Sequence, residues 1–168
     1  MPLKAEGEFA LVREKLENAL MLAGQPVKRG TMAHDHDVYM TLTDSAAQEY
    51  DAAAIELYAP RLEELATRDN HKLYLGILYR AQGIAKRLEG NFDDAAELFP
   101  RALEIFHALG TRWQSGRTLV ELGELERTRH NPNAARNYFE RAVNEFDALR
   151  AAPDASRARG ALEEVVSE

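Results

Sequence analysis

The run His34-Asp35-His36-Asp37 comes closest, among the residues of this sequence, to a metal site or an acid–base site. Imidazoles and carboxylates two residues apart can converge on one cation. A metal site also needs a third or fourth ligand, yet His71, His107 and His130 share no spacing with the run. We therefore interpret the run as a solvated polar loop, and a metal-dependent enzyme that uses it is a distant alternative.

Other signatures of catalysis are absent from the sequence. It contains no phosphate-binding glycine loop, no Gly-x-Ser-x-Gly elbow and no His-Glu-x-x-His pattern. It also contains no cysteine, which excludes a disulfide framework, thiolate zinc sites and a cysteine nucleophile. The residues therefore predict a protein that is not an enzyme and that uses no cofactor and no metal.

Length and charge narrow the class of protein further. A chain of 168 residues, 45% of them hydrophobic, is long enough for one domain but short for two. The 21 Lys and Arg against 28 Asp and Glu give a net charge of −7, so we expect no nucleic-acid partner. The longest apolar run, residues 73–79, is far shorter than the ~20 residues that span a bilayer. We expect no membrane association and a cytoplasmic protein.

A repeat with a period of 40 residues organises the second half of the chain. When residues 71–110 are placed over residues 111–150, eleven positions carry the same residue type. A period of this length is typical of a solenoid whose units cannot bury their apolar faces alone. The matches include Gly83/Gly123, Ala95/Ala135, Phe99/Phe139 and Ala102/Ala142.

Turn and capping residues divide each repeat into two helices, which we expect near 71–89, 92–109, 112–129 and 132–150. Gly110 can take the left-handed conformation that ends a helix. Thr111 with Gln114, and Asn91 and Asn131, have the side chains that cap the start of the next helix. Short turns then make the two helices of each repeat antiparallel.

Small residues indicate how the two helices of a repeat pack. A glycine inside a helix costs about 1 kcal/mol relative to alanine, so Gly83 and Gly123 need a compensating reason. Close approach of the second helix supplies that reason, with Phe99 and Phe139 filling the adjoining space.

The stretch Leu88-Glu89-Gly90-Asn91-Phe92-Asp93-Asp94-Ala95 resembles the inter-helix turn of the tetratricopeptide repeat family. Gly83, Ala95, Phe99 and Ala102 are similar to that family's small-small-aromatic-small spacing. The resemblance covers about half the chain, and the longer unit is similar to repeats of bacterial signalling and regulatory proteins. It implies an all-α solenoid of antiparallel helix pairs that binds other proteins.

The chain ends are expected to complete one domain, residues 1–168. A degenerate helix pair with a long connection, Gly24–Asp44, is expected within 6–68, followed by repeats at 71–110 and 111–150 and a capping helix at 154–166. Ser45 with Gln48 predicts the start of a helix that runs to Arg68. The amphipathic segment 6–23 has three possible roles: the first helix of the degenerate pair, a cap, or a dimer contact. Pro60 and Pro100 predict kinks, with broken helices as the alternative.

The concave surface is the predicted binding site, because the resemblance implies that the first helix of each pair lines it. There the apolar residues would set affinity and the arginines would select a partner with acidic groups. The alternative is that the N-terminal helix covers Ile77, Ile84 and Leu88 as ordinary core. The candidate residues are Ile77, Arg80, Ile84, Arg87, Arg117, Glu121, Glu124 and Arg127.

These observations predict a non-enzymatic interaction module that binds a protein or peptide, as a regulatory or assembly adaptor. A homo-oligomeric scaffold is the second hypothesis, and it gains support if an apolar stripe is left uncovered on the monomer.

Overall fold

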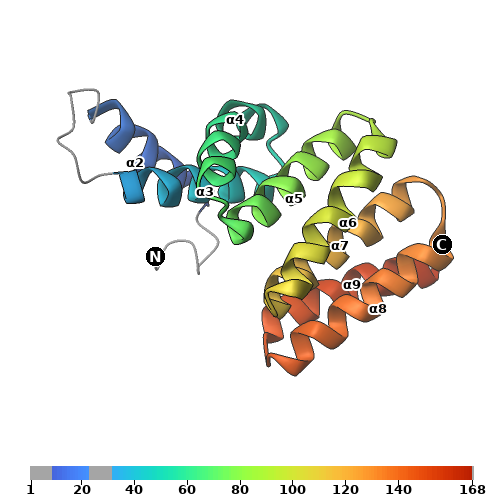
Figure 1. Cartoon of the computed structure of the whole chain (residues 1–168). Helices are drawn as coiled ribbons and strands as arrows, with labels where there is room; N and C mark the ends of the chain where they lie inside the picture. The colour runs from blue at the N-terminus through green and yellow to red at the C-terminus, as the bar shows by residue number, and fades with distance from the viewer. Residues whose placement is uncertain (1–8, 23–31, 168) are drawn as a thin grey trace.

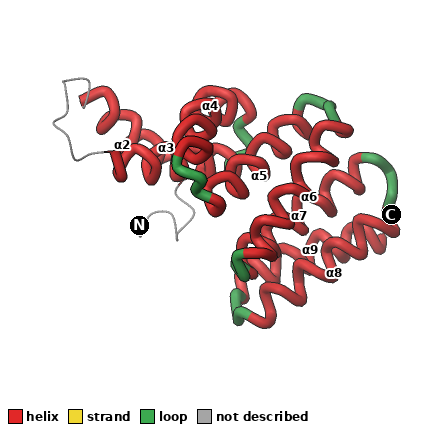
Figure 2. Tube along the Cα trace, viewed as in Figure 1, coloured by secondary structure: helices red, strands yellow, loops and turns green. Residues whose placement is uncertain are grey.

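The computed structural model describes residues 9–22 and 32–167, which form helices joined by short turns, with no strand among them (Figures 1 and 2). This confirms the predicted all-α fold. The four helices predicted in the repeats agree with the structure to within two residues. In chain order the helices are α2 (Phe9–Leu22), α3 (Met32–Gln48), α4 (Ala52–Arg68), α5 (Lys72–Leu88), α6 (Phe92–Ala108), α7 (Arg112–Thr128), α8 (Pro132–Ala148) and α9 (Ala152–Ser167).

The 40-residue period extends beyond the two repeats that the sequence reveals. Helices α3, α5, α7 and α9 begin at residues 32, 72, 112 and 152, and α4, α6 and α8 begin at residues 52, 92 and 132. We call α3–α4 the first repeat, α5–α6 the second and α7–α8 the third. Each helix packs on the next along the chain, and α3 also contacts α5 while α5 contacts α7. The first helices of the repeats therefore form one continuous layer.

The turns between α3 and α9 share one geometry, repeated every twenty residues. A residue with positive φ follows each helix, and Gly110, with φ of 66°, takes the predicted left-handed conformation. The next N–H then donates to a carbonyl five residues earlier, as from Thr111 to Phe106 at 3.0 Å. The other residues with positive φ are Tyr50, Asn70, Gly90, His130 and Arg150.

The predicted side-chain caps at Asn91, Thr111 and Asn131 are wrong, because none of the three makes a capping hydrogen bond. The Thr111 hydroxyl donates instead to the Phe106 carbonyl at 3.2 Å. The side-chain amide of Asn131 donates to Glu126 at the end of the preceding helix. The tight turn leads directly into the next helix. The side chains of Thr111 and Asn131 therefore bond to the preceding helix and not to the first turn of the next one.

The predicted long connection Gly24–Asp44 is wrong from residue 32 onward, because α3 begins at Met32. Residues 24–31 lie outside the described part of the chain. Ser45 lies inside α3 instead of opening a helix, and α4 begins at Ala52 with a cap from Asp51, whose Oδ1 accepts from the Ala54 N–H at 3.0 Å. The run from His34 to Asp37 is helical, so its interpretation as a loop is also wrong.

The glycine and phenylalanine packing predicted for the repeats is confirmed. A Cβ added at Gly83 would lie 2.7 Å from Phe99 Cε1, and one added at Gly123 would lie 2.5 Å from Phe139 Cε1. A second such contact joins Gly76 to Phe106, and its counterpart joins Gly116 to Phe146. Helices α4 and α6 continue through Pro60 and Pro100, so the alternative of broken helices is wrong.

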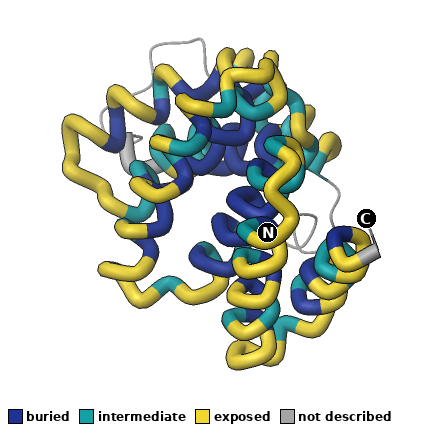
Figure 3. Tube along the Cα trace, turned by 90° about the vertical axis from the view of Figure 1, so that its right-hand side faces the viewer, coloured by how far each residue is buried: buried dark blue, intermediate teal, exposed yellow. Residues whose placement is uncertain are grey.

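The two end helices cover the ends of the stack. Helix α2 packs against α3, with Val12 buried and with Leu16 and Leu20 against the core. Helix α9 buries Ala155 and Ala158 against α8. Figure 3 shows the exposed residues concentrated on the outer sides of the helices and the buried residues facing inward.

Candidate functional site

A pocket of about 220 Å³ opens on the concave side, between the helices that begin the repeats. We call it the concave pocket. Most of its residues come from α3, α5, α7 and α9, or from the turn that follows α3. Its apolar lining is Phe9, Ala47, Ile84, Val120 and Phe146, and its polar lining is Gln48, Tyr50, Arg80, Arg117, Glu121, Asp154 and Arg157.

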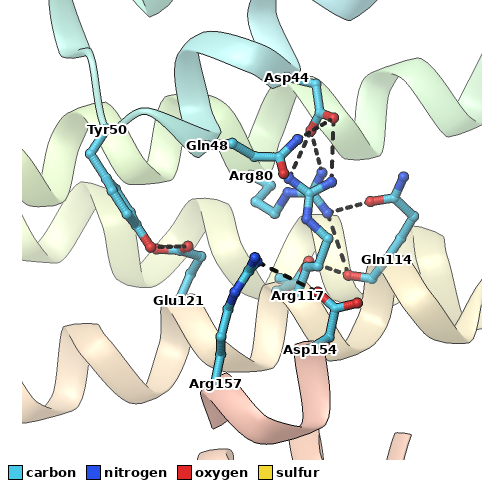
Figure 4. Close-up of polar contacts among 10 residues, drawn as sticks. Asp44, Gln48, Tyr50, Arg80, Gln114, Arg117, Glu121, Asp154 and Arg157 are labelled. Atoms are coloured by element: carbon cyan, nitrogen blue, oxygen red, sulfur yellow. Dashed lines mark hydrogen bonds and ion pairs between the residues drawn. The ribbon is translucent and has the colours of Figure 1, made fainter. Parts of the chain in front are cut away.

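Two arginines meet one carboxylate at the inner wall of the concave pocket (Figure 4). Arg80 Nη2 donates to Asp44 Oδ1 at 2.8 Å, and Arg117 Nη2 lies 3.1 Å from the same oxygen. The side chains of Arg80 and Asp44 are only 1% and 2% exposed, whereas that of Arg117 is 12% exposed. We call these three residues the Asp44 cluster. The amide of Gln48 completes it by donating to Asp44 Oδ2 at 3.1 Å.

The charges of the Asp44 cluster do not balance, because two guanidinium groups face one carboxylate. Burial, and then the like charge of Arg117, lower the pKa of Arg80 to about 10, although Asp44 opposes this change. Arg80 therefore remains positively charged at neutral pH. Its Nε is buried without a hydrogen-bond partner, while Nη1 donates to Gln114 Oε1 at 2.5 Å.

A second polar link crosses the concave side between Tyr50 and Glu121. The Tyr50 hydroxyl donates to Glu121 Oε1 at 3.1 Å, and Arg87 Nη2 donates to Glu121 Oε2 at 2.9 Å. Burial raises the pKa of Glu121, although Arg87 and the Tyr50 hydroxyl act to lower it. The negative charge of Glu121, followed by burial, raises the pKa of Tyr50. Because Tyr50 follows α3 and Glu121 lies on α7, this link joins the first repeat to the third.

The outer edge of the concave pocket is formed by the start of α9. Asp154 Oδ2 accepts a hydrogen bond from Trp113 Nε1 at 3.1 Å, and the Arg117 guanidinium lies 4.7 Å from the centre of the Trp113 ring. Arg157 is 78% exposed, and its Nη1 lies 4.0 Å from Asp154 Oδ1. The pocket therefore has a buried arginine on α5, a half-buried arginine on α7 and an exposed arginine on α9.

The structure separates the predicted binding residues into groups. Arg80, Ile84, Arg117 and Glu121 line the concave pocket, but Ile77, Arg87, Glu124 and Arg127 do not. Glu124 and Arg127 pair with each other at 2.6 Å, beside α9.

Four of the predicted contact residues are buried, so their prediction as surface groups is wrong. Ile77, Arg80, Ile84 and Glu121 are 3%, 1%, 2% and 7% exposed. The alternative is right that Ile77 and Ile84 are core residues. It is wrong that the N-terminal helix covers Ile77, because Met40 of α3 packs there, and it is wrong for Leu88, which is 43% exposed. Helix α3, most of which the sequence analysis placed in a long connection, supplies the cover of Ile77.

Sequence reasoning missed five polar residues of the site, namely Asp44, Gln48, Tyr50, Asp154 and Arg157. The available signal was the 40-residue period itself. Extended upstream, it places Asp44 at the register of Ile84, and extended downstream it places Arg157 at the register of Arg117. The missed residues come from helices whose sequences match the repeat poorly.

The candidate metal run makes contacts between helices. His36 Nε2 lies 2.8 Å from Asp69 Oδ2 and 3.2 Å from the Leu65 carbonyl, and Asp37 accepts a hydrogen bond from the Tyr74 hydroxyl. Within residues 9–22 and 32–167, no three His, Asp or Glu side chains are grouped so as to hold a metal ion. The side chain of His34 is outside the described set. Nor is any described helix long and apolar enough to cross a membrane.

Comparisons with known proteins agree with this architecture. The tetratricopeptide repeat family model matches residues 73–144. The solved structure of BtubC (BKLC) from P. vanneervenii is similar over 98% of this chain and 74% of that chain, with a TM-score of 0.61 and 15% identity. At that identity the likeness shows the fold alone. No curated protein gives a significant match. The family match and the helix pairs together show tetratricopeptide repeats within residues 73–144.

Proposed function

We propose that this chain is a cytoplasmic adaptor that binds a protein or peptide on its concave side and catalyses no reaction. Tetratricopeptide repeats generally mediate interactions between proteins. The observation that carries the proposal is the concave pocket, where polar groups from three repeats and α9 surround an apolar floor. Mixed polar and apolar lining of this kind suits recognition of a polypeptide.

The size of the concave pocket favours one side chain of a partner over a complete small molecule. Its volume of about 220 Å³ lies below the ~300 Å³ at which pockets for small molecules begin. A partner segment would therefore insert a single side chain and continue along the concave side. The half-buried groups near its path, Arg87, Glu124 and Arg127, would meet the rest of the segment.

Arg80, Ile77 and Ile84 have a supporting role in this proposal. They hold α5 against α3, and they position the residues that a partner can reach. Arg117 then remains, from the set predicted by sequence, as the pocket residue nearest to solvent.

A homo-oligomeric scaffold has less support. That hypothesis gains from an uncovered apolar stripe, yet among the described residues of α2 the buried Val12 and the half-buried Leu16 and Leu20 pack on the core.

Photo-crosslinking at two matched positions tests the proposed function. Benzoylphenylalanine replaces Tyr50, which is 47% exposed at the pocket, or Leu57, which is 69% exposed on the outer side of α4. We expect partners to be captured from position 50 and not from position 57, and the captured protein then to bind the purified chain. Equal capture at both positions, or capture only at position 57, would contradict binding in the concave pocket.

A further inference from the structure

Resting on the proposed function, we infer that the concave pocket receives an aspartate or glutamate side chain of the partner, which pairs with Arg117 and Arg157. The partner is thus a polypeptide with an acidic residue at the inserted position. The ligand group is a carboxylate, and the inner wall that it would approach has two guanidinium groups facing one carboxylate.

The Asp44 cluster contains more positive than negative charge. Arg80 and Arg117 share the carboxylate of Asp44, so the cluster has one positive charge in excess. The other acidic residues of the pocket are already engaged. Glu121 binds Tyr50 and Arg87, while Asp154 binds Trp113 and lies 4.0 Å from Arg157. Placing a charge in a protein interior is costly unless an opposite charge accompanies it. A second carboxylate would supply the missing negative charge.

A partner can reach part of this positive charge through the pocket. Arg80 is enclosed, but Arg117 lines the pocket with 12% of its side chain exposed. Arg157 stands at the mouth on α9, 78% exposed. Figure 4 shows Arg117 reaching toward Asp44 and Arg157 paired with Asp154, and both arginines line the concave pocket. Guanidinium groups in this arrangement suit a carboxylate, which accepts two hydrogen bonds at once.

The remaining charges favour a carboxylate over a phosphate group. Glu121 and Asp154 also line the pocket, and both would repel a dianion more strongly than a monoanion. The volume of about 220 Å³ also suits one acidic side chain beside the apolar lining of Ile84 and Val120.

Titration of the full chain with matched probes tests the inference. The probes are N-acetyl-glutamate amide, its neutral isostere N-acetyl-glutamine amide, and inorganic phosphate at equal ionic strength. The readout is the set of arginine Nε–H signals in ¹⁵N NMR spectra. We expect the Arg117 and Arg157 signals to move with the glutamate probe alone. An equal response to the glutamine probe, or a stronger response to phosphate, would overturn the inference.

Two variants and one control complete the test. Arg117→Gln should weaken binding of the glutamate probe by about ten- to a hundredfold, the range for hydrogen bonds to a charged group. It leaves Asp44 paired with Arg80, so the fold should survive. Arg157→Gln, at an exposed position, should weaken binding less, and Arg136→Gln on the outer side of α8 should change nothing. Unchanged binding in both Arg117→Gln and Arg157→Gln would overturn the inference.

The test also separates this inference from the proposed function. A partner captured at position 50 is prepared as a peptide with each acidic residue changed in turn to its amide. If one change abolishes binding, the inference is supported. If every amide peptide binds with full affinity, the inference is wrong while concave binding stands. If nothing is captured at position 50, the proposed function itself is wrong.

Discussion

The first repeat and the two later repeats have the same backbone geometry. They differ in which helix of the pair supplies the larger side chain at a contact. In the second and third repeats, glycines at 83 and 123 receive the rings of Phe99 and Phe139. At the same registers the first repeat has Thr43, which is 0% exposed, and Ala59, which is 3% exposed. The larger residue has moved from the second helix of the pair to the first.

A second register shows the same exchange. Gly76 and Gly116 receive Phe106 and Phe146, whereas the first repeat has His36 and Ala66. Close packing constrains the summed volume at a contact and leaves open which helix supplies it. The three repeats therefore share one geometry and differ in the residues that fill it.

Giving the second repeat the packing residues of the first repeat tests this exchange of volume, and it should produce the largest effects. Phe99→Ala alone should cost about 3–5 kcal/mol through the cavity it leaves. Gly83→Thr alone should cost about 1–3 kcal/mol, because its Cβ would lie 2.7 Å from Phe99 Cε1. The double variant, which reproduces Thr43 and Ala59, should be more stable than the sum of the two losses predicts. Urea unfolding of all four proteins gives the coupling energy.

The surface change Glu97→Ala on the same helix serves as the control for that cycle. If the losses from Phe99→Ala and Gly83→Thr were strictly additive, the two positions would not share one contact. That result would contradict the packing of Phe99 against Gly83.

The buried carboxylate of the first repeat gives the next largest effect. Asp44 occupies the register of Ile84, and Asp44→Asn would leave Arg80 and Arg117 facing each other without a counter-charge. We expect a loss of about 3 kcal/mol, near the lower end for a broken buried pair because Arg117 is partly solvated. Thermal and urea unfolding measure it. Asp93→Asn, at a fully exposed side chain, should change stability little. A similar small change for Asp44→Asn would show that the cluster does not stabilise the fold.

Substitutions in the turns between helices should change the free energy of unfolding by a smaller amount. Gly90 and Gly110 take positive φ, and His130 takes φ of 58° at the position equivalent to Gly90. Because a side chain disfavours this conformation, His130→Gly should stabilise the protein by about 1 kcal/mol. Gly110→Ala should lower stability by a similar amount. Paired urea midpoints check both, and a destabilised His130→Gly protein would mean that the imidazole makes a contact of its own.

The link between the first and third repeats should give the smallest effect, visible as a dependence on pH. Burial raises the pKa of Glu121 above its ordinary value of 4.5, so the folded chain holds this proton more tightly than the unfolded chain. The resulting stability is present below about pH 4.5 and is lost as pH rises through the folded pKa. Glu121→Gln should remove this loss. Unfolding free energies at a series of pH values, compared with those of Glu140→Gln, measure the difference.

Much of the second and third repeats could be predicted because their residues match each other. Gly83, Phe99 and Gly110 each combine a residue type with a strict geometric requirement, so a coincidence at 40 residues carries direct structural meaning. The first repeat matches the second at only five positions: Tyr39/Tyr79, Glu49/Glu89, Pro60/Pro100, Arg61/Arg101 and Glu64/Glu104. Identity alone could not reveal α3.

The candidate site was harder to predict because several of its polar residues are buried. The consecutive residues Thr43, Asp44 and Ser45 are all at most 1% exposed, yet in the sequence they suggest a solvated segment. Arg80 on α5 shares the helical spacing of the buried Ile77 and Ile84, but its charge suggests a surface residue. Only the placement of Asp44 explains why Arg80 is buried. A polar residue inside a protein is recognisable only through its partner.

The sequence by itself determined the helical period, the antiparallel pairs of the later repeats and the glycine contacts, because these depend on residues close together within one repeat. The tertiary structure alone decided that α3 completes a first repeat and that Asp44 meets Arg117 from 73 positions away. It also decided which arginines are enclosed and which reach the concave pocket. Such contacts join helices two repeats apart, so their geometry follows from the curvature of the whole stack and leaves no local pattern in the chain.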